Sequence, residues 1–367
     1  MLLNGTKRTR RTGRITLALT LIALAVQPAI AIEHVEVIFE AERFAGWPAN
    51  NGIWIWGDEV VVGFTLGYHK PSDGHPIDRD RPSGPMQARS LDGGHTWSVE
   101  LPSFMEAEGE QRPVEAFTSR GNFTHPDFAA RFSQGDFFFS HDRAKTWDGP
   151  FALPDFGRPS LLARTDYIVN GKRDLTAFIA SSKDGGNEGW PLVIRTKDGG
   201  QTWNQVGWIG EQPPEGYGYA IMPSTVQLKT GGLLSMIRRG GVFDGERRWW
   251  IEPYLSPDEG ASWYKLDEPY INNAGNPAAM IRLQDGRIAL TYGWRTAPYG
   301  MRARISDDEG QTWGEEFILR SDGGGWDLGY PRSVQRSDGK CLTIYYFNDG
   351  ARKERHIVCT IWDPSNF

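Results

Sequence analysis

One short pattern occurs five times in this chain, and it constrains the fold more than any other feature. Each copy has a Ser or Thr, an Asp two residues later, usually a Gly two residues after that, and a Trp three residues further on. The copies are Ser90–Trp97, Ser140–Trp147, Thr196–Trp203, Ser256–Trp263 and Ser306–Trp313. Their first residues are 50, 56, 60 and 50 positions apart, a period typical of propellers, solenoids and arrays.

Each copy has the composition of a β-turn that also packs. The Asp carboxylate can accept hydrogen bonds from turn N–H groups, the Gly can adopt a positive φ, and the Trp ring can pack against a neighbouring unit. Only the second copy departs, with Ala144 at the Gly position. We therefore interpret the pattern as a recurring scaffold turn.

The pattern resembles the Asp box, or BNR repeat, of the sialidase (neuraminidase) superfamily. The resemblance implies an all-β fold, a six-bladed β-propeller with four-stranded antiparallel blades. Residues 32–367 would give six units of 56 residues, close to the observed period. The chain has 44 Gly, 23 Pro and 15 Trp and no long helical periodicity, which favours strands joined by turns. We expect one propeller domain over residues 32–367.

The first 31 residues are expected to be a signal peptide. Five Lys and Arg residues precede an apolar run from Ile15 to Val26, and Ala29-Ile30-Ala31 resembles a cleavage site. The apolar run is too short to cross a membrane, so no membrane span is expected. The sequence therefore predicts a secreted or periplasmic protein.

Removing residues 1–31 takes the formal net charge from −6 to −11. This negative charge argues against nucleic acid as a partner.

The two cysteines lie in strand-like runs on either side of a turn. Cys341 and Cys359 are equally distant from Gly350, so their side chains could face each other across a hairpin. A disulfide and a pair of buried free thiols both remain open, because the sequence does not fix the Cβ geometry that a bridge requires.

A second repeat, with one proline in each unit, locates the expected pocket. The prolines are Pro48, Pro126, Pro159, Pro223, Pro277 and Pro331. Proline is tolerated where strands begin, so we expect each to open an inner strand beside the central channel. The flanking residues then form the pocket floor: Trp47, His125, Asp127, Arg158, Met222, Asn276, Tyr330 and Arg332. The last blade is expected to close by pairing Val35–Phe39 with Ile357–Ile361.

The resemblance to sialidases implies a particular set of catalytic groups: a Tyr nucleophile, an Asp acid/base and three Arg residues that bind the substrate carboxylate. Tyr330 matches the nucleophile, Arg238 the second arginine and Arg295 the third, while Asp78 or Asp80 occupies the acid/base loop. Trp47 stands where the family has its first arginine, and Met222 where it has a Glu. Arg158 or Arg332 could replace the missing guanidinium, so an exo-glycosidase for acidic sugars is expected.

Two other functions remain open. A polysaccharide lyase or a rhamnosidase would use His125, Tyr330 and Arg158, in a lyase to remove a proton beside a uronate carboxylate. A non-catalytic carbohydrate-binding propeller would stack sugars on the aromatic residues Trp249, Trp250, Tyr254 and Trp294. The sequence has no zinc-ligand spacing, phosphate loop or EF-hand loop. We therefore expect no cofactor or metal, a glycan as substrate, and a monomer.

Overall fold

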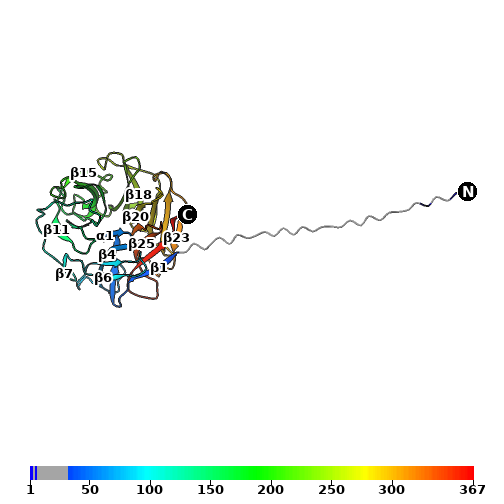
Figure 1. Cartoon of the computed structure of the whole chain (residues 1–367), viewed down its shortest axis with the longest axis horizontal. Helices are drawn as coiled ribbons and strands as arrows, with labels where there is room; N and C mark the ends of the chain where they lie inside the picture. The colour runs from blue at the N-terminus through cyan, green and yellow to red at the C-terminus, as the bar shows by residue number, and fades with distance from the viewer. Residues whose placement is uncertain (3–4, 6–31) are drawn as a thin grey trace. The chain divides into compact units, whose positions relative to one another are not determined.

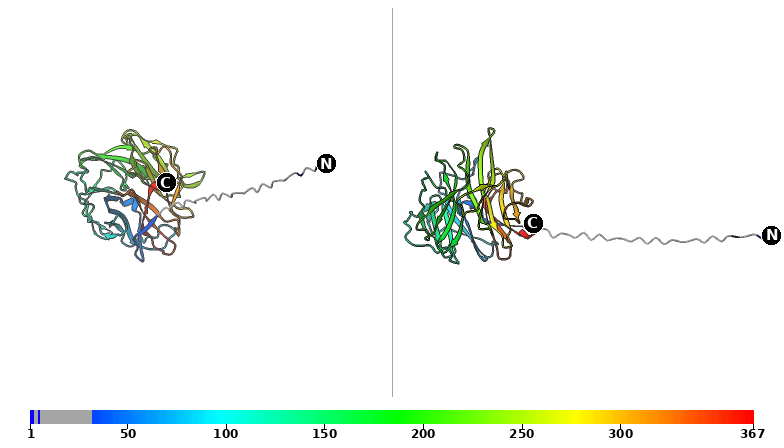
Figure 2. Two further views of the ribbon diagram at one scale, coloured as in Figure 1. Left: turned by 45° about the vertical axis from the view of Figure 1, so that its right-hand side comes forward. Right: turned by 90° about the horizontal axis from the view of Figure 1, so that it is seen from above.

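The structure, a computed structural model, describes residues 1, 2, 5 and 32–367. The apolar run and cleavage site of the expected signal peptide (1–31) lie outside the described residues. Residues 32–367 form six antiparallel sheets arranged around one axis (Figure 1), and Figure 2 shows the same sheets from two other directions. The predicted six-bladed propeller is confirmed. No helix in the described part of the chain is long and apolar enough to cross a membrane.

Each blade is a sheet whose strands follow one another from the channel outwards. Blade 1 has β2 (Arg43–Gly46), β4 (Glu59–Tyr68), β5 (Gly84–Ser90) and β6 (Ser98–Glu100), with β3 (Ile53–Trp56) also paired to β4 and the short helix α1 (Pro48–Asn51) between β2 and β3. Blade 2 has three strands, β9 (Ala129–Ser133), β10 (Asp136–Ser140) and β11 (Asp148–Ala152), and follows the small hairpin of β7 (Met105–Ala107) and β8 (Glu110–Gln111).

Blades 3 to 6 each have four strands. Blade 3 has β12 (Tyr167–Gly171), β13 (Asp174–Ser182), β14 (Glu188–Thr196) and β15 (Asn204–Trp208), and blade 4 has β16 (Tyr219–Gln227), β17 (Leu233–Phe243), β18 (Glu246–Ser256) and β19 (Tyr264–Lys265). Blade 5 has β20 (Ala278–Arg282), β21 (Ile288–Trp294), β22 (Gly300–Ser306) and β23 (Phe317–Arg320), and blade 6 has β24 (Gly329–Gln335), β25 (Cys341–Phe347), β26 (His356–Trp362) and β1 (Glu33–Ile38). A 3₁₀ turn (Pro364–Asn366) follows.

The last blade closes the ring by taking its outer strand from the start of the domain. Strand β1 pairs antiparallel with β26, and Val35 lies opposite Cys359. This is the predicted pairing, and it leaves no open edge between the first and last blades.

The two cysteines are buried free thiols. Strands β25 and β26 form the predicted hairpin, but Cys341 pairs with Trp362 and Cys359 with Ile344. The two sulfurs also belong to different core clusters. The register therefore resolves the open choice in favour of free thiols, and burial raises the pKa of both.

The five Asp boxes form the expected turns, each starting at the end of a strand. In the fifth, Asp308 accepts hydrogen bonds from Ser306 Oγ (2.9 Å), Thr312 N (2.8 Å) and Thr312 Oγ1 (2.6 Å). Gly310, at φ +84, lies against blade 4: a Cβ built on it would be 2.3 Å from Leu234 Cδ2. The box thus joins two blades through a close backbone contact.

The prolines do not all open inner strands, which corrects the prediction. Pro277 directly precedes β20, but Pro223 and Pro331 lie inside β16 and β24, and Pro48 opens helix α1. In both strands the pairing register shifts beside the proline, because proline cannot donate to the ladder. Pro159 lies ahead of β12, and the residues that directly follow it, Ser160 to Leu162, already pair with the end of β13.

Blade 2 has no counterpart of the innermost strand of the other blades, because its Asp box follows the second of three strands, whereas in blades 1, 3, 4 and 5 the box follows the third strand from the channel. Strand β9 leads into β10, and β10 ends at the second Asp box. The segment before β9 therefore lies at the box end of the channel, whereas inner strands such as β16 and β24 begin at the opposite end. We call that opposite end the site end.

Candidate active site

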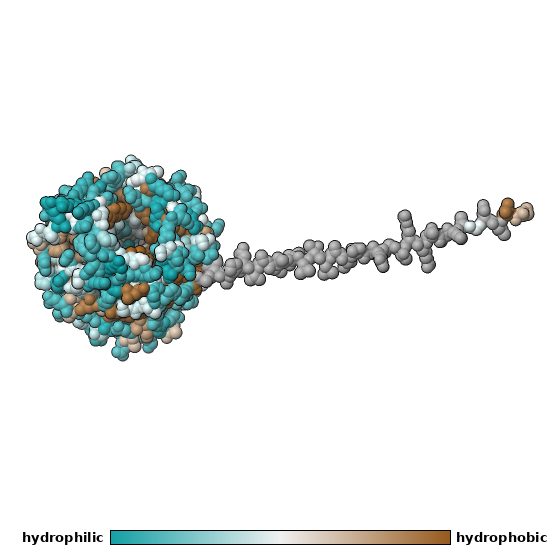
Figure 3. All heavy atoms as spheres, in the orientation of Figure 1, coloured by the Kyte–Doolittle hydropathy of each residue, from teal (hydrophilic) through white to brown (hydrophobic). Residues whose placement is uncertain are grey.

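Three bulky residues at the site end share an uncommon backbone conformation. Trp47, Met222 and Tyr330 have φ values of 59°, 55° and 51°, and each is followed by a proline. Non-glycine residues rarely adopt positive φ, and such positions concentrate at functional sites. All three side chains pack in or against one apolar cluster. Figure 3 shows a hollow with apolar walls near the middle of the face seen in Figure 1.

Tyr330 is held at both ends of the residue. Its backbone N–H donates to Asn276 Oδ1 (3.0 Å), and its phenolic oxygen lies 2.7 Å from Arg238 Nη1. Asn276 also accepts from Gly293 N (3.2 Å) and donates to Leu328 O (2.7 Å). Asn276 is therefore a buried clamp that fixes where β24 begins and where the Tyr330 ring points.

Arg238, on β17, carries a charge that no carboxylate in the described residues pairs with directly. Its Nη1 contacts Tyr330 Oη and Met222 Sδ (3.6 Å), and its Nε is buried without a hydrogen-bond partner. The guanidinium also lies 5.3 Å from the Tyr330 ring and 5.5 Å from the Tyr219 ring. Burial lowers the pKa of Arg238, but the two phenols outweigh that effect and the net pKa is raised. Arg238 thus stays charged.

A second polar group lies beside Tyr330. Asp327 is fully buried and contacts His75 Nδ1 (2.6 Å), Tyr346 Oη (2.5 Å) and Arg355 Nε (3.0 Å). Burial raises the pKa of Asp327, but His75, Tyr346 and Arg295 lower it overall. Asp327 is therefore ionised at neutral pH, and the His75 Nδ1 beside it must carry the hydrogen of this bond.

The ring of His75 lies among three aromatic side chains. Its centroid is 5.2 Å from that of Trp47, 5.8 Å from that of Trp326 and 6.5 Å from that of Tyr330. His75 belongs to the loop between β4 and β5, the loop in which the acid/base was expected.

The two carboxylates predicted in that loop are engaged elsewhere. Asp78 Oδ1 and Asp80 Oδ2 lie 3.1 Å and 2.8 Å from Lys70 Nζ, and the Asp80 side chain is 82% exposed. A hydrogen bond from the Asp80 backbone and the contact with Lys70 lower the pKa of Asp78. The loop therefore directs His75, and neither Asp, into contact with the Tyr330 cluster.

Arg295 lies near Tyr330 but is occupied by the protein. Its guanidinium donates to Leu328 O (3.1 Å), Gly275 O (3.3 Å) and Tyr346 Oη (2.8 Å), and it lies 4.0 Å from Asp327. Its side chain is only 4% exposed. The arrangement makes Arg295 a support for the loops around Asp327.

The remaining predicted residues do not join this cluster. His125 packs against His141, and Asp127 pairs with Arg143 (2.6 Å), both at the second Asp box. Arg158 bonds Ser182 O and Asp184 on blade 3 and lies over the Trp190 and Trp208 rings. Arg332 donates to Ala49 O (2.6 Å) and lines a cavity of about 310 Å³ with Asp166. These four residues are dispersed over the molecule.

Sequence reasoning missed several groups at the site end. His75, Asp327 and Trp326 lie in loops without periodic signal, and none flanks a repeat proline. Glu188, at the start of β14, pairs with Arg164 (2.5 Å), and its charge contributes to the raised pKa of Arg238. The spacing of Glu188 ahead of the third Asp box matches no repeated feature.

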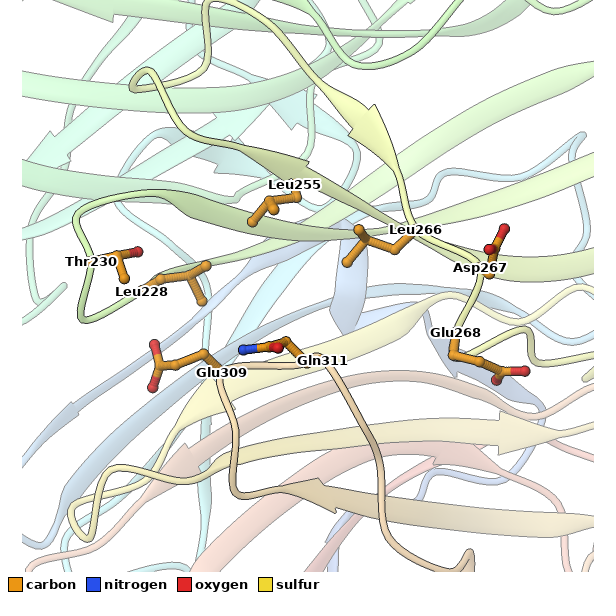
Figure 4. Close-up of a pocket in the computed structure, with 8 residues that line it drawn as sticks. All are labelled: Leu228, Thr230, Leu255, Leu266, Asp267, Glu268, Glu309 and Gln311. Atoms are coloured by element: carbon orange, nitrogen blue, oxygen red, sulfur yellow. The ribbon is translucent and has the colours of Figure 1, made fainter.

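Two of the larger grooves lie away from Tyr330. A groove of about 530 Å³ runs between blades 4 and 5 on the box side, with apolar Leu228, Leu255 and Leu266 beside Glu309 (Figure 4). A groove of about 570 Å³ is lined by Trp250 and Tyr254, two of the predicted stacking residues, with Glu252 between them. The other two pack separately: Trp249 against Tyr217, and Trp294 beneath Arg302.

Comparisons with known proteins agree with the fold. A family model described as a BNR repeat-like domain matches residues 124–343. A search of curated proteins finds no match. Among solved structures, a protein of unknown function from Dyadobacter fermentans DSM 18053 is 21% identical with a TM-score of 0.69, over 92% of this chain and 100% of that one.

Two enzymes share the fold at lower identity. A Penicillium chrysogenum alpha-L-arabinanase complexed with arabinobiose is 14% identical, with a TM-score of 0.59 over 90% of this chain and 97% of that one. The Trypanosoma rangeli sialidase is 14% identical, with a TM-score of 0.57 over 91% of this chain and only 60% of that one. Because the family model spans more than half of its residues, the chain belongs to the BNR repeat-like domain family.

Proposed function

We propose that the protein is an exported glycosidase that acts on sugars bearing a carboxylate, with terminal sialic acid the first candidate. The observation that carries the proposal is Arg238: a largely buried guanidinium, beside a tyrosine, with no direct carboxylate partner among the described residues. An unpaired buried charge is costly, and a guanidinium fits a carboxylate in a bidentate manner. A bound sugar acid would supply the missing counter-ion.

Tyr330 is the nucleophile in this proposal. Its oxygen would attack the anomeric carbon, and the glycosyl–tyrosine would then be hydrolysed by water, a route known for tyrosine-dependent glycosidases. Met222 supplies no carboxylate beside the phenol, so the hydrogen bond from Arg238 is the contact that stabilises negative charge on Oη. Trp47 and Trp326 offer aromatic faces beside the reacting centre.

A panel of 4-methylumbelliferyl glycosides tests the proposal. The panel contains sialic acid, glucuronic acid and galacturonic acid glycosides together with their neutral counterparts. We expect turnover of at least one acidic member only, and a loss of at least 1,000-fold in Tyr330→Phe, because the phenolic oxygen forms the covalent bond. Tyr264→Phe, at a tyrosine that is 59% exposed, is the matched control and should retain wild-type turnover.

The outcomes separate the candidate functions. Turnover that persists in Tyr330→Phe would contradict the nucleophile assignment. A new absorbance of an unsaturated uronate without hydrolysis would instead indicate a lyase. Binding without any turnover would indicate a carbohydrate-binding propeller.

A further inference from the structure

The His75–Asp327 pair is the part of the site that the sequence comparison with sialidases does not account for. It stands where that comparison leads one to expect a carboxylic acid, yet the two Asp residues of the loop contact Lys70. An imidazole held by a buried carboxylate is a suitable proton-transfer group near neutral pH.

The hydrogen bonds define which nitrogen is available. Nδ1 is committed to Asp327 Oδ1 at 2.6 Å, and Nε2 has no hydrogen-bond partner among residues 32–367. The His75 side chain is 28% exposed, while that of Asp327 is fully buried. One nitrogen is therefore fixed by the protein, and the ring keeps access to solvent for the other.

The His75 ring lies close to the rings of Trp47 and Tyr330. It meets Trp47 edge to face, at an interplanar angle of 82°, and Tyr330 at 89°. Retaining glycosidases that use two carboxylates place the nucleophile and the acid about 5–5.5 Å apart. Ring centroids separated by 6.5 Å are compatible with such a distance between the reacting atoms on the two rings.

We infer that His75 is the catalytic acid/base of the site and that Asp327 is its positioning residue. The inference rests on the proposed glycosidase function. In the first step, Tyr330 as phenolate bonds to the anomeric carbon, the glycosidic C–O bond breaks, and protonated His75 gives its Nε2 proton to the leaving oxygen. In the second step, neutral His75 takes a proton from water, the water oxygen bonds to the anomeric carbon, and the phenolate leaves. The pair thus returns to its starting state.

The charged and titratable groups around the His75–Asp327 pair come from several elements. They are Asp327 and Tyr330 at the start of blade 6, Tyr346 on β25, Arg295 after β21 and Arg355 before β26. Two of these groups carry positive charge, and Asp327, the one that carries negative charge, lies 2.6 Å from His75 Nδ1. This explains why loss of the pair should alter the pH profile.

The decisive experiment compares two leaving groups in His75→Gln. Aryl leaving groups depart without a proton, whereas sugar leaving groups need one. We expect kcat/KM to fall 100- to 10,000-fold for a substrate with a sugar leaving group, and less than 10-fold for the matching 4-nitrophenyl glycoside. One limb of the pH–rate profile should also disappear. His95→Gln, at an exposed histidine in the first Asp box, is the matched control and should behave as wild type.

Each other outcome is informative. Equal losses for both leaving groups in a folded His75→Gln, or no loss, would overturn the assignment of His75 while leaving the glycosidase proposal intact. Absence of wild-type turnover on every acidic glycoside would overturn the proposed function and the inference with it. If His75→Gln is unfolded by circular dichroism, His75→Asn takes its place.

A second measurement does not require a substrate. Nitrogen-15 NMR of the histidine side chains should show one strongly hydrogen-bonded Nδ1–H that is lost in His75→Gln and retained in His95→Gln. A His75 with its hydrogen on Nε2 only would contradict the pairing with Asp327.

Discussion

Substitution of two neighbouring arginines on β17 should change the free energy of unfolding by different amounts. Among the described residues, Arg238 has only a phenol and a thioether as hydrogen-bonding partners, whereas Arg239 pairs with the buried carboxylate of Glu252 at 2.7 Å. Replacing an unpaired buried charge with an apolar side chain is often neutral or stabilising, while breaking a buried ion pair costs about 3–5 kcal/mol. Arg239 is 16% exposed and Lys265 also lies near Glu252, so we expect about 2–4 kcal/mol for Arg239→Met.

For Arg238→Met we expect a change in unfolding free energy within about 1 kcal/mol, since the lost hydrogen bond to Tyr330 is offset by removal of the desolvated charge. Its effect on ligand binding should be larger. Loss of a charged partner costs about 2–5 kcal/mol, and a value near 3 kcal/mol corresponds to about a 150-fold weaker Kd for a sugar acid.

The assay is a double-mutant cycle by calorimetry. Wild type and Arg238→Met are each titrated with the free sugar acid released from the glycoside that is turned over fastest, and with the methyl ester of that acid. Urea unfolding gives the stability of each protein. The ester should bind both proteins about equally weakly, whereas the acid should distinguish them. A variant that is destabilised by more than about 3 kcal/mol and still prefers the acid would refute the reasoning, because Arg238 would then be a structural residue.

Two further predictions concern stability. Gly310→Ala should cost about 2–4 kcal/mol of unfolding free energy and lower Tm in scanning calorimetry, because the new Cβ would lie 2.3 Å from Leu234 at a positive φ. The control, Ala144→Gly at the same box position, should change stability by less than about 1 kcal/mol. Equal losses in the two variants would contradict the close-contact argument. Burial raises the pKa of Asp166 to about 7 in the folded protein, above the pKa of an Asp in the unfolded chain. Between pH 4 and 7 the folded protein therefore binds a proton at Asp166 that the unfolded chain has lost. The free energy of unfolding should fall by about 2–4 kcal/mol as pH rises from 4 to 7. Asp166→Asn should remove that part of the pH dependence in urea titrations, and an unchanged slope would show that Asp166 ionises normally.

Periodic features of the sequence predicted the fold well. The Asp boxes recur because every blade needs the same turn, so their number and spacing gave the propeller, and the pairing of β1 with β26 followed from closure of the ring. Tyr330 and Arg238 were found because each lies beside a repeated feature: Tyr330 directly precedes a repeat proline, and Arg238 follows a Gly-containing turn.

Features set by tertiary structure were not predictable in the same way. His75 is a single residue in a polar loop, and only folding brings it beside Asp327, which is far away in sequence. The proline rule failed in blade 2 because a proline restricts the local backbone but does not determine at which end of a sheet it lies. Whether the two cysteines face each other depends on the register of the β25–β26 hairpin. Cys341 lies opposite Trp362 and not opposite Cys359, and equal spacing from Gly350 does not reveal this.

The pairing of β1 with β26 also has a consequence for how the protein is made. The strand that is synthesised first cannot find its partner until nearly the whole domain has been completed, so the ring closes through the longest-range contact in the chain. Contacts of such high sequence separation slow folding. Until β1 and β26 pair, each exposes an unpaired strand edge to solvent. A chain that lacks its last strand should therefore aggregate even though five blades are complete.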